Sequence, residues 1–127
     1  MIVLDASVLI AHLDGSDPHH DGAQSLLEAA GEEALGASAI TLAETLFSPA
    51  RADRLEDAEE ALARLGVREL MLREGAPARL AKLRAEIGLK LPDCCVLLAA
   101  QEHSAVVASF DSHLLAAACK LGLETTG

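Results

Sequence analysis

Short apolar runs alternate with longer amphipathic stretches along the whole chain. The runs predict β-strands at residues Ile2–Leu4, 34–37, 67–72, 105–108 and 123–124, the last only a stub. The amphipathic stretches predict helices at Ala6–Leu13, 18–30, 39–48, 51–65, Ala76–Ile87, 92–103 and 112–121. Strands separated by helices imply right-handed crossovers. The sequence therefore predicts an α/β fold, a three-layer α/β/α sandwich around a mainly parallel sheet of four to five strands.

Several helix ends are marked by residues with a known preference for them. Asp17 followed by Pro18 is typical of an N-cap with proline at the first helical position. Ser38 is expected to cap the third helix, and Pro49 is expected to end it.

The size of the chain fits one domain over residues 1–127. It has 127 residues, of which 51% are hydrophobic and 24% charged. A chain of this length can bury roughly two thirds of its unfolded surface without a disulfide or a structural metal. Cys94 and Cys95 are adjacent and Cys119 stands alone, so there is neither a zinc spacing nor a disulfide framework. We therefore expect a reducing cytoplasm as its location.

No segment predicts an association with a membrane. The N-terminal stretch MIVLDASVLI lacks a basic region before its apolar residues and has an acid at position 5. No apolar run approaches the length of about 18 residues that a membrane span needs.

The charge distribution excludes a protein that grips nucleic acid through a broad basic face. The net charge is −10, residues 1–50 contain no Lys or Arg, and nine of the ten basic residues lie between Arg51 and Lys90. Phe47 and Phe110 are the only aromatic residues, so a passive module that stacks bases is unlikely on composition. No glycine-rich phosphate loop is present. Any surface that guides RNA must come from the basic middle section.

Four isolated acids lie at strand-to-helix junctions or in the helix that follows: Asp5, Glu44, Asp93 and Asp111. Each has an ordinary alternative. Asp5 and Asp111 can cap helices, and Asp93 can interact with a helix dipole. Glu44 can complete a capping box with Thr41, although Ser38 is the better cap and leaves Glu44 inside an otherwise apolar helix.

These alternatives do not explain why all four acids fall at one edge of the predicted sheet. Two carboxylates about 4 Å apart repel by roughly 4 kcal/mol at an effective dielectric near 20, so a cation is expected among them. An all-oxygen set suits Mg²⁺ or Mn²⁺ better than zinc. Ser7 and Ser109 can orient a carboxylate of this set through their hydroxyls, or simply cap locally. The five histidines are interpreted as surface or helix-end residues.

Four segments resemble the PIN-domain family, in its order and spacing over essentially the whole chain. They are MIVLDASVLIAHL, SAITLAETLF, LPDCCVLLAA and VASFDSHLLAAACKLG. The closest resemblance is to the VapC-type toxins of bacterial toxin–antitoxin pairs. Ser109 is a mild departure, because many relatives carry Thr there.

The resemblance implies a metal-dependent endoribonuclease that hydrolyses RNA phosphodiester bonds. Its acidic site would consist of Asp5, Glu44, Asp93 and Asp111, with Ser7 and Ser109 at the polar positions. We expect Asp5 and Asp93 to bind Mg²⁺ or Mn²⁺ directly, and Asp111 and Glu44 to hold a second ion or its waters; Asp111 is thus also a candidate metal ligand. One ion or two fits the sequence equally well.

The resemblance also implies two protein partners. A cognate antitoxin would lay a helix on an apolar surface, which we expect at Leu42, Leu46, Phe47, Leu55 and Leu62. A homodimer would bring two acidic sites into one groove.

Two other functions remain open on the sequence. One is a catalytically inactive PIN-like protein that acts only through its antitoxin. The other is a metal-dependent phosphatase or phosphate receiver, which also carries acids at strand ends. The phosphatase needs a second Asp two residues after its nucleophile, where Ser7 stands, and a receiver needs a Lys that is missing between Lys90 and Lys120.

Overall fold

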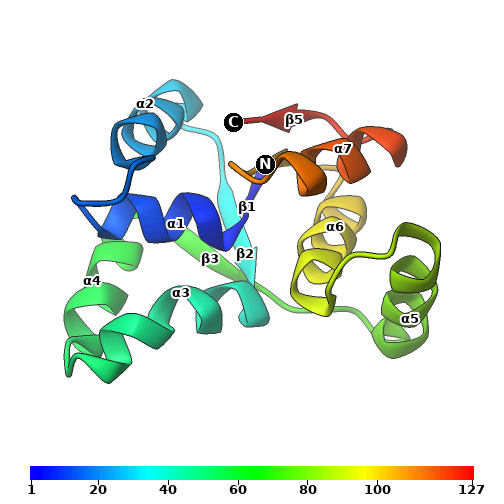
Figure 1. Ribbon diagram of the computed structural model, residues 1–127, viewed down its shortest axis with the longest axis horizontal. Helices are drawn as coiled ribbons and strands as arrows, with labels where there is room; N and C mark the ends of the chain where they lie inside the picture. The colour runs from blue at the N-terminus through cyan, green and yellow to red at the C-terminus, as the bar shows by residue number, and fades with distance from the viewer.

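A parallel sheet of five strands forms the centre of the protein in a computed structural model that describes residues 1–127 (Figure 1). The strands are β1 (Ile2–Leu4), β2 (Leu35–Ser38), β3 (Val67–Leu70), β4 (Val106–Ala108) and β5 (Thr125–Thr126). Their order across the sheet is β3-β2-β1-β4-β5, and every neighbouring pair is parallel. The predicted fold class is confirmed.

Seven helices cover the two faces of this sheet. They are α1 (Ala6–Leu13), α2 (His20–Ala30), α3 (Ala39–Arg51), α4 (Leu55–Leu65), α5 (Ala76–Ile87), α6 (Leu91–His103) and α7 (Ser112–Lys120). Helices α1 to α4 lie on one side and α5 to α7 on the other, as Figure 1 shows. None of them is long and apolar enough to cross a membrane.

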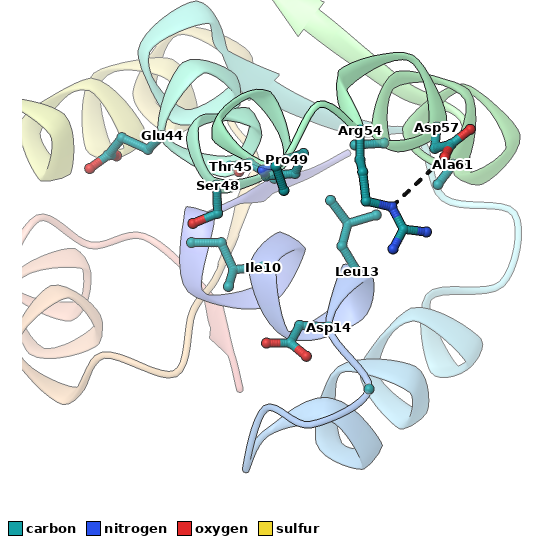
Figure 2. Close-up of a pocket in the computed structure, with 13 residues that line it drawn as sticks. Ile10, Leu13, Asp14, Glu44, Thr45, Ser48, Pro49, Arg54, Asp57 and Ala61 are labelled. Carbon is teal, nitrogen blue, oxygen red and sulfur yellow. Dashed lines mark ion pairs between the residues drawn. The ribbon is translucent and has the colours of Figure 1, made fainter.

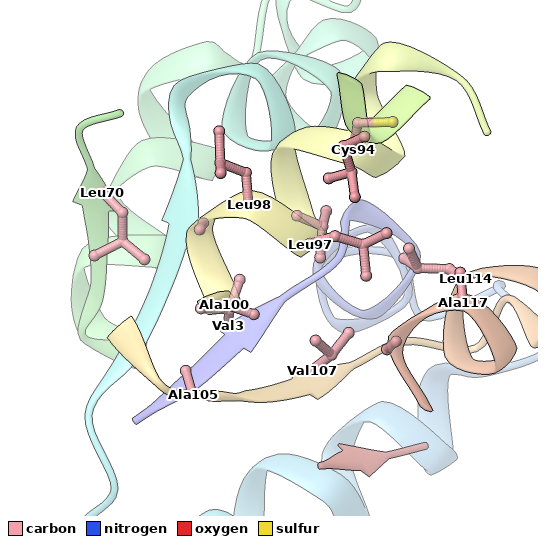
Figure 3. Close-up of a cluster of buried hydrophobic side chains, with 14 of the residues drawn as sticks. Val3, Leu70, Cys94, Leu97, Leu98, Ala100, Ala105, Val107, Leu114 and Ala117 are labelled. Atoms are coloured by element: carbon pink, nitrogen blue, oxygen red, sulfur yellow. The ribbon is translucent and has the colours of Figure 1, made fainter. Parts of the chain in front are cut away.

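Alternating side chains of the central strand β1 divide the core into two parts. Ile2 and Leu4 pack with α1, α2 and α4, whereas Val3 points to the opposite face. On that face Val3 meets Val107 and the buried helix α6, whose residues Cys94 to Ala100 are all inaccessible to solvent (Figure 3). A run buried on all sides explains why α6 has no polar stripe. Because α6 is packed on all sides, the position of its first turn relative to the sheet is fixed.

Close packing of β2 against β3 depends on a glycine. A Cβ at Gly36 would lie 2.7 Å from Leu70 Cδ1, and Leu70 is itself buried in the core. A larger residue at this position would force the buried Leu70 side chain to move.

Three predicted boundaries of helices are wrong, each for a local reason. Helix α2 begins at His20 because Asp17 forms a turn first, accepting bonds from His19 N at 2.8 Å and His20 N at 2.9 Å. Pro49 lies inside α3, and the break comes instead at Asp53, whose φ of 57° is left-handed, so α4 starts at Leu55 rather than at Arg51.

The last strand is also shifted from its predicted position. Leu123 N donates to Ala118 O at 3.0 Å to close α7, so this amide is not available to a strand. Pairing with β4 starts when Glu124 O accepts from Val107 N at 2.8 Å, which places the strand at Thr125–Thr126. The third strand ends at Leu70, two residues earlier than predicted.

Candidate active site

The order in which the chain adds strands to the sheet reverses between β1 and β4. The candidate site lies beyond the carboxyl ends of these two strands. From β1 the chain moves outward to β2 and β3, and then returns to the other side of β1 with β4. In open parallel sheets ligands bind at this switch point. Asp5 follows β1, and Ser109 follows β4.

Asp5 is held by two serines, Ser7 in the first turn of α1 and Ser109 directly after β4. Ser7 Oγ and Ser109 Oγ each donate to Asp5 Oδ2 at 2.7 Å, and the two hydroxyl oxygens are 3.4 Å apart. Asp5 precedes α1 without any side-chain capping bond, so its ordinary role as a helix cap is excluded. Asp5 is 8% exposed and Ser109 is fully buried. These contacts fix one carboxylate oxygen, and no hydrogen bond reaches Oδ1.

The same serines organise the segment that follows β4. Phe110 N donates to Ser7 Oγ at 3.1 Å, and Asp111 N donates to Ser109 Oγ at 2.9 Å. Asp111 Oδ1 in turn caps α7, accepting from His113 N at 2.8 Å and Leu114 N at 3.3 Å. The predicted capping role of Asp111 is therefore present, and it occupies one of its two oxygens.

Asp93 occupies the first helical turn of α6, directly after Pro92. It is half-buried, and its pKa is raised above the ordinary value first by burial and then by the negative charges of Asp5 and Asp111, while Lys90 lowers it. A shift caused by two other carboxylates requires them to lie nearby. The structure thus brings Asp93, Asp5 and Asp111 to one place.

Glu44 joins this group from α3, but its environment differs from the prediction. The sequence placed Glu44 inside an otherwise apolar helix, where an inward-facing position was expected, whereas the side chain is exposed, together with Ile40 at 45% and Phe47 at 59%. The pKa of Glu44 is nevertheless raised, first by partial burial and then by Asp5 and Asp93. Glu44 reaches the acid cluster from its solvent side.

A cleft of about 380 Å³ opens over this cluster. Its walls include Glu44, Asp93 and Asp111, and also Lys90 and His113. His113 Nδ1 is 3.7 Å from Asp111 Oδ1, so the interpretation of His113 as a surface residue holds, although it stands at the edge of the site. Sequence reasoning did not single out Lys90, because only the fold brings it to the acids.

The acids are close enough to raise one another's pKa, but their side chains do not form a complete metal-binding site. No three His, Cys, Asp or Glu side chains of the chain are arranged so that they could hold a metal ion. The donor chemistry still fits a hard divalent cation, because the set is all oxygen and the carboxylates raise one another's pKa. The carboxylates would have to move together around the ion.

An aromatic pair borders the site on the side of α2. The rings of His19 and Phe110 stack with centroids 4.7 Å apart and an interplanar angle of 8°. The sequence gave no reason to expect this stack. It has only two phenylalanines, and the second ring of the pair belongs to a histidine.

A second cleft lies beside Glu44, between α1, α3 and α4. It encloses about 450 Å³, and Ile10, Leu13 and Pro49 contribute to its apolar lining (Figure 2). Three of the five residues predicted to bind a partner helix are not on a free surface. Leu62 is buried in the core, and Leu42 and Leu46 pack against the core. Phe47 and Leu55 remain exposed on α3 and α4.

The fold and the site define the class of this protein: an α/β domain with a parallel sheet and a cluster of acids at the switch point of the sheet. The sequence matches the PIN domain family over residues 2–120, so the chain belongs to this family. No curated protein matches the sequence closely.

Solved structures share the fold along nearly the whole chain. FitAcB from Neisseria gonorrhoeae is 25% identical, with 100% of this chain and 97% of that one covered at a TM-score of 0.76. A toxin–antitoxin complex from Klebsiella pneumoniae is 24% identical, with 91% of both chains covered at 0.76. VapC20 from Mycobacterium tuberculosis, described as a sarcin–ricin loop cleaving toxin, is 19% identical, with 92% and 95% covered at 0.71.

Proposed function

We propose that this protein is a metal-dependent endoribonuclease and the toxin of a toxin–antitoxin pair. The observation that carries the proposal is that Glu44, Asp93 and Asp111 line one cleft of a PIN fold, and that Asp5 lies near enough to help raise the pKa of Glu44 and Asp93 beyond the effect of burial. Such a concentration of like charge is unfavourable for stability and typical of functional sites.

Asp5, Asp93 and Asp111 would hold Mg²⁺ or Mn²⁺, and Glu44 would complete the site. When bound, the cation supplies positive charge for the phosphate oxygens and makes a water more acidic. Hydrogen bonds orient the carboxylates that would bind the cation. Ser7 and Ser109 fix Asp5 Oδ2 and leave Oδ1 without a protein partner. The amides of α7 hold Asp111 Oδ1 in the same way, which leaves Oδ2 for other contacts.

RNA is the proposed substrate. The solved relative that is described as cleaving the sarcin–ricin loop supports a substrate of this kind, and an acidic chain needs a cation to approach any phosphodiester. The exposure of Glu44 and Asp111 leaves the cleft accessible to a polymer rather than closed around a small molecule.

The partner surface is proposed at the cleft between α1, α3 and α4. One of the solved relatives is a toxin–antitoxin complex, and here Phe47 and Leu55 leave apolar surface exposed on two of the helices that line the cleft. A helix of the antitoxin would bury this surface, and the position of Glu44 on the cleft wall lets the partner reach the acids.

A homodimer and a location in the reducing cytoplasm complete the proposal. The three free cysteines are consistent with a reducing location.

The test is cleavage of total RNA by the purified protein with Mg²⁺ or Mn²⁺, with EDTA and Asp93→Asn as controls for the site. Glu86→Gln, on the exposed side of α5, is a matched control that removes a carboxylate elsewhere. We expect discrete cuts by the wild type and by Glu86→Gln, and none in EDTA or by Asp93→Asn.

Absence of cleavage with several metals and RNAs would contradict the nuclease and favour a protein that acts only through its antitoxin. A phosphatase is less well supported, since Ser7 stands at the position of its second Asp and is hydrogen bonded to Asp5.

A further inference from the structure

Most basic side chains of the middle section are occupied elsewhere in the fold. Arg54, Arg64 and Arg79 form ion pairs with Asp57, Glu60 and Glu102. Arg73 donates to the backbone carbonyl of Glu102 at 3.1 Å, and the Arg51 guanidinium lies 5.6 Å above the centre of the Phe47 ring. These contacts engage five of the nine basic side chains of the middle section away from the acidic cleft.

Lys90 is the single Lys or Arg that lines the acidic cleft. It shares the walls of this cleft with Glu44, Asp93 and Asp111. Its charge lowers the pKa of both Glu44 and Asp93 against the larger opposing effects, so it lies within electrostatic reach of both. Yet Lys90 forms no ion pair within 4.0 Å of any carboxylate. A lysine that served to neutralise the acids would be expected in direct contact with one of them.

The backbone of Lys90 is fixed, while its side chain is free. Lys90 is the N-cap residue of α6, with φ −65° and ψ 157°, and its carbonyl accepts from Cys94 N at 3.0 Å. Its side chain makes no capping bond, and the residue is exposed. Because α6 is buried over most of its length, the attachment point of the ammonium is as rigid as the core. The ammonium group itself can turn toward a ligand in the cleft.

We propose that Lys90 binds a backbone phosphate of the nucleic acid in the acidic cleft and so positions the strand for cleavage. This inference rests on the proposed nuclease function. An ammonium is a compact point charge that binds phosphate without a fixed fork geometry, which suits a polymer whose bases vary. Once cations occupy the carboxylates, the acids cease to attract Lys90, and a phosphate becomes its strongest available partner.

The first test is RNA binding by Lys90→Gln, with Lys82→Gln as the matched control. Lys82 is exposed on α5, forms no ion pair and does not line the cleft. The probe is a short fluorescein-labelled single-stranded RNA in Ca²⁺, which takes the place of Mg²⁺ to slow cleavage. Loss of one phosphate contact should weaken binding about tenfold and reduce the slope of log K against log salt by about 0.7. Lys90→Arg should restore both.

The second test is steady-state cleavage by the same variants in Mg²⁺. A positioning role raises KM for Lys90→Gln about tenfold at saturating Mg²⁺, as in the binding test. Loss of the positive charge beside Glu44 and Asp93 also lowers the Mg²⁺ concentration that gives half-maximal activity. If only that Mg²⁺ concentration falls while KM at saturating Mg²⁺ stays, Lys90 only competes with the metal and the inference is wrong.

The two proposals fail in different ways. If the wild type cuts RNA while Lys90→Gln and Lys82→Gln behave alike, the inference about Lys90 fails and the nuclease stands. If the wild type neither cuts nor binds RNA, the nuclease fails and takes the inference with it. Thermal unfolding of each variant establishes that the comparison is between folded proteins.

Discussion

Ser109 Oγ donates to Asp5 Oδ2 at 2.7 Å and joins two residues that are 104 positions apart in the sequence. The bond exists because β1 and β4 are neighbours in the sheet, with Leu4 opposite Ala108. It ties Asp5 to the segment after β4 that leads to Asp111, so the pairing of the strands also sets the geometry of the site.

Replacement of Ser109 by Ala should destabilise the protein and lower cleavage. The change removes a donor to the buried Asp5 carboxylate and an acceptor for Asp111 N, which should cost about 1 to 3 kcal/mol. Urea unfolding measures the loss, with Ser112→Ala at an exposed position of α7 as the control. Equal stability of Ser109→Ala and wild type would show that the bond contributes nothing.

Asp93→Asn should stabilise the metal-free protein at pH 7. Because the pKa of Asp93 is raised above 3.8 in the folded state, the folded protein holds this proton more tightly than the unfolded chain does. Above both pKa values the ionised carboxylate therefore lowers the free energy of unfolding, and below pH 3.8 this penalty disappears. The gain from Asp93→Asn should be present at pH 7 in EDTA and should vanish as the pH falls through this range.

Urea unfolding of both proteins across the pH range checks this expectation. Glu86→Gln provides the comparison, since it removes an exposed acid that does not line the cleft. A loss of stability in Asp93→Asn at pH 7 would mean that the carboxylate makes favourable contacts, and would contradict the sign of the shift.

Mg²⁺ or Mn²⁺ should raise the melting temperature of the wild type. A ligand that binds only the folded state at one hundred times its Kd adds about 2.7 kcal/mol of stability. The increase should be much smaller for Asp93→Asn, and NaCl of equal ionic strength should not reproduce it. An equal increase in both proteins would place the ion away from the acids.

Arg79→Ala should destabilise the protein more than Arg64→Ala does. Arg79 pairs at 3.0 Å with Glu102, whose side chain is only 1% exposed and whose second oxygen, Oε2, has no partner. Removal of the cation leaves a buried carboxylate uncompensated, at a cost of about 2 kcal/mol. The exposed pair of Arg64 and Glu60, at 3.9 Å, should contribute less than about 0.5 kcal/mol. Chemical denaturation of the two variants gives the comparison directly.

The sequence predicted those features that depend on neighbouring residues. The bounds of α1 and α5, and the capping of α3 by Ser38, follow from local hydrophobic period and cap chemistry. The placement of the acids at strand ends is equally local, because Asp5 directly follows its strand. The order of the strands then brings these ends to the same edge.

Features that depend on tertiary contacts were not predictable in the same way. The exposure of Glu44 follows from the rotation of α3, which packs Leu42 and Leu46 toward the core and turns Ile40 and Phe47 outward. The convergence of two serines on one oxygen of Asp5 requires the pairing of β1 with β4, which no short segment encodes. The approach of Lys90 to Glu44 likewise depends on the contact between α3 and α6, two helices from opposite faces of the sheet.

The cleft between α1, α3 and α4 is built entirely from residues 10 to 61, whereas the acid cluster needs Ser109 and Asp111. During synthesis every residue of that cleft therefore leaves the ribosome well before the strand that completes the cluster. The residues of the proposed docking surface are thus already outside when the residues that complete the acid cluster have yet to be made.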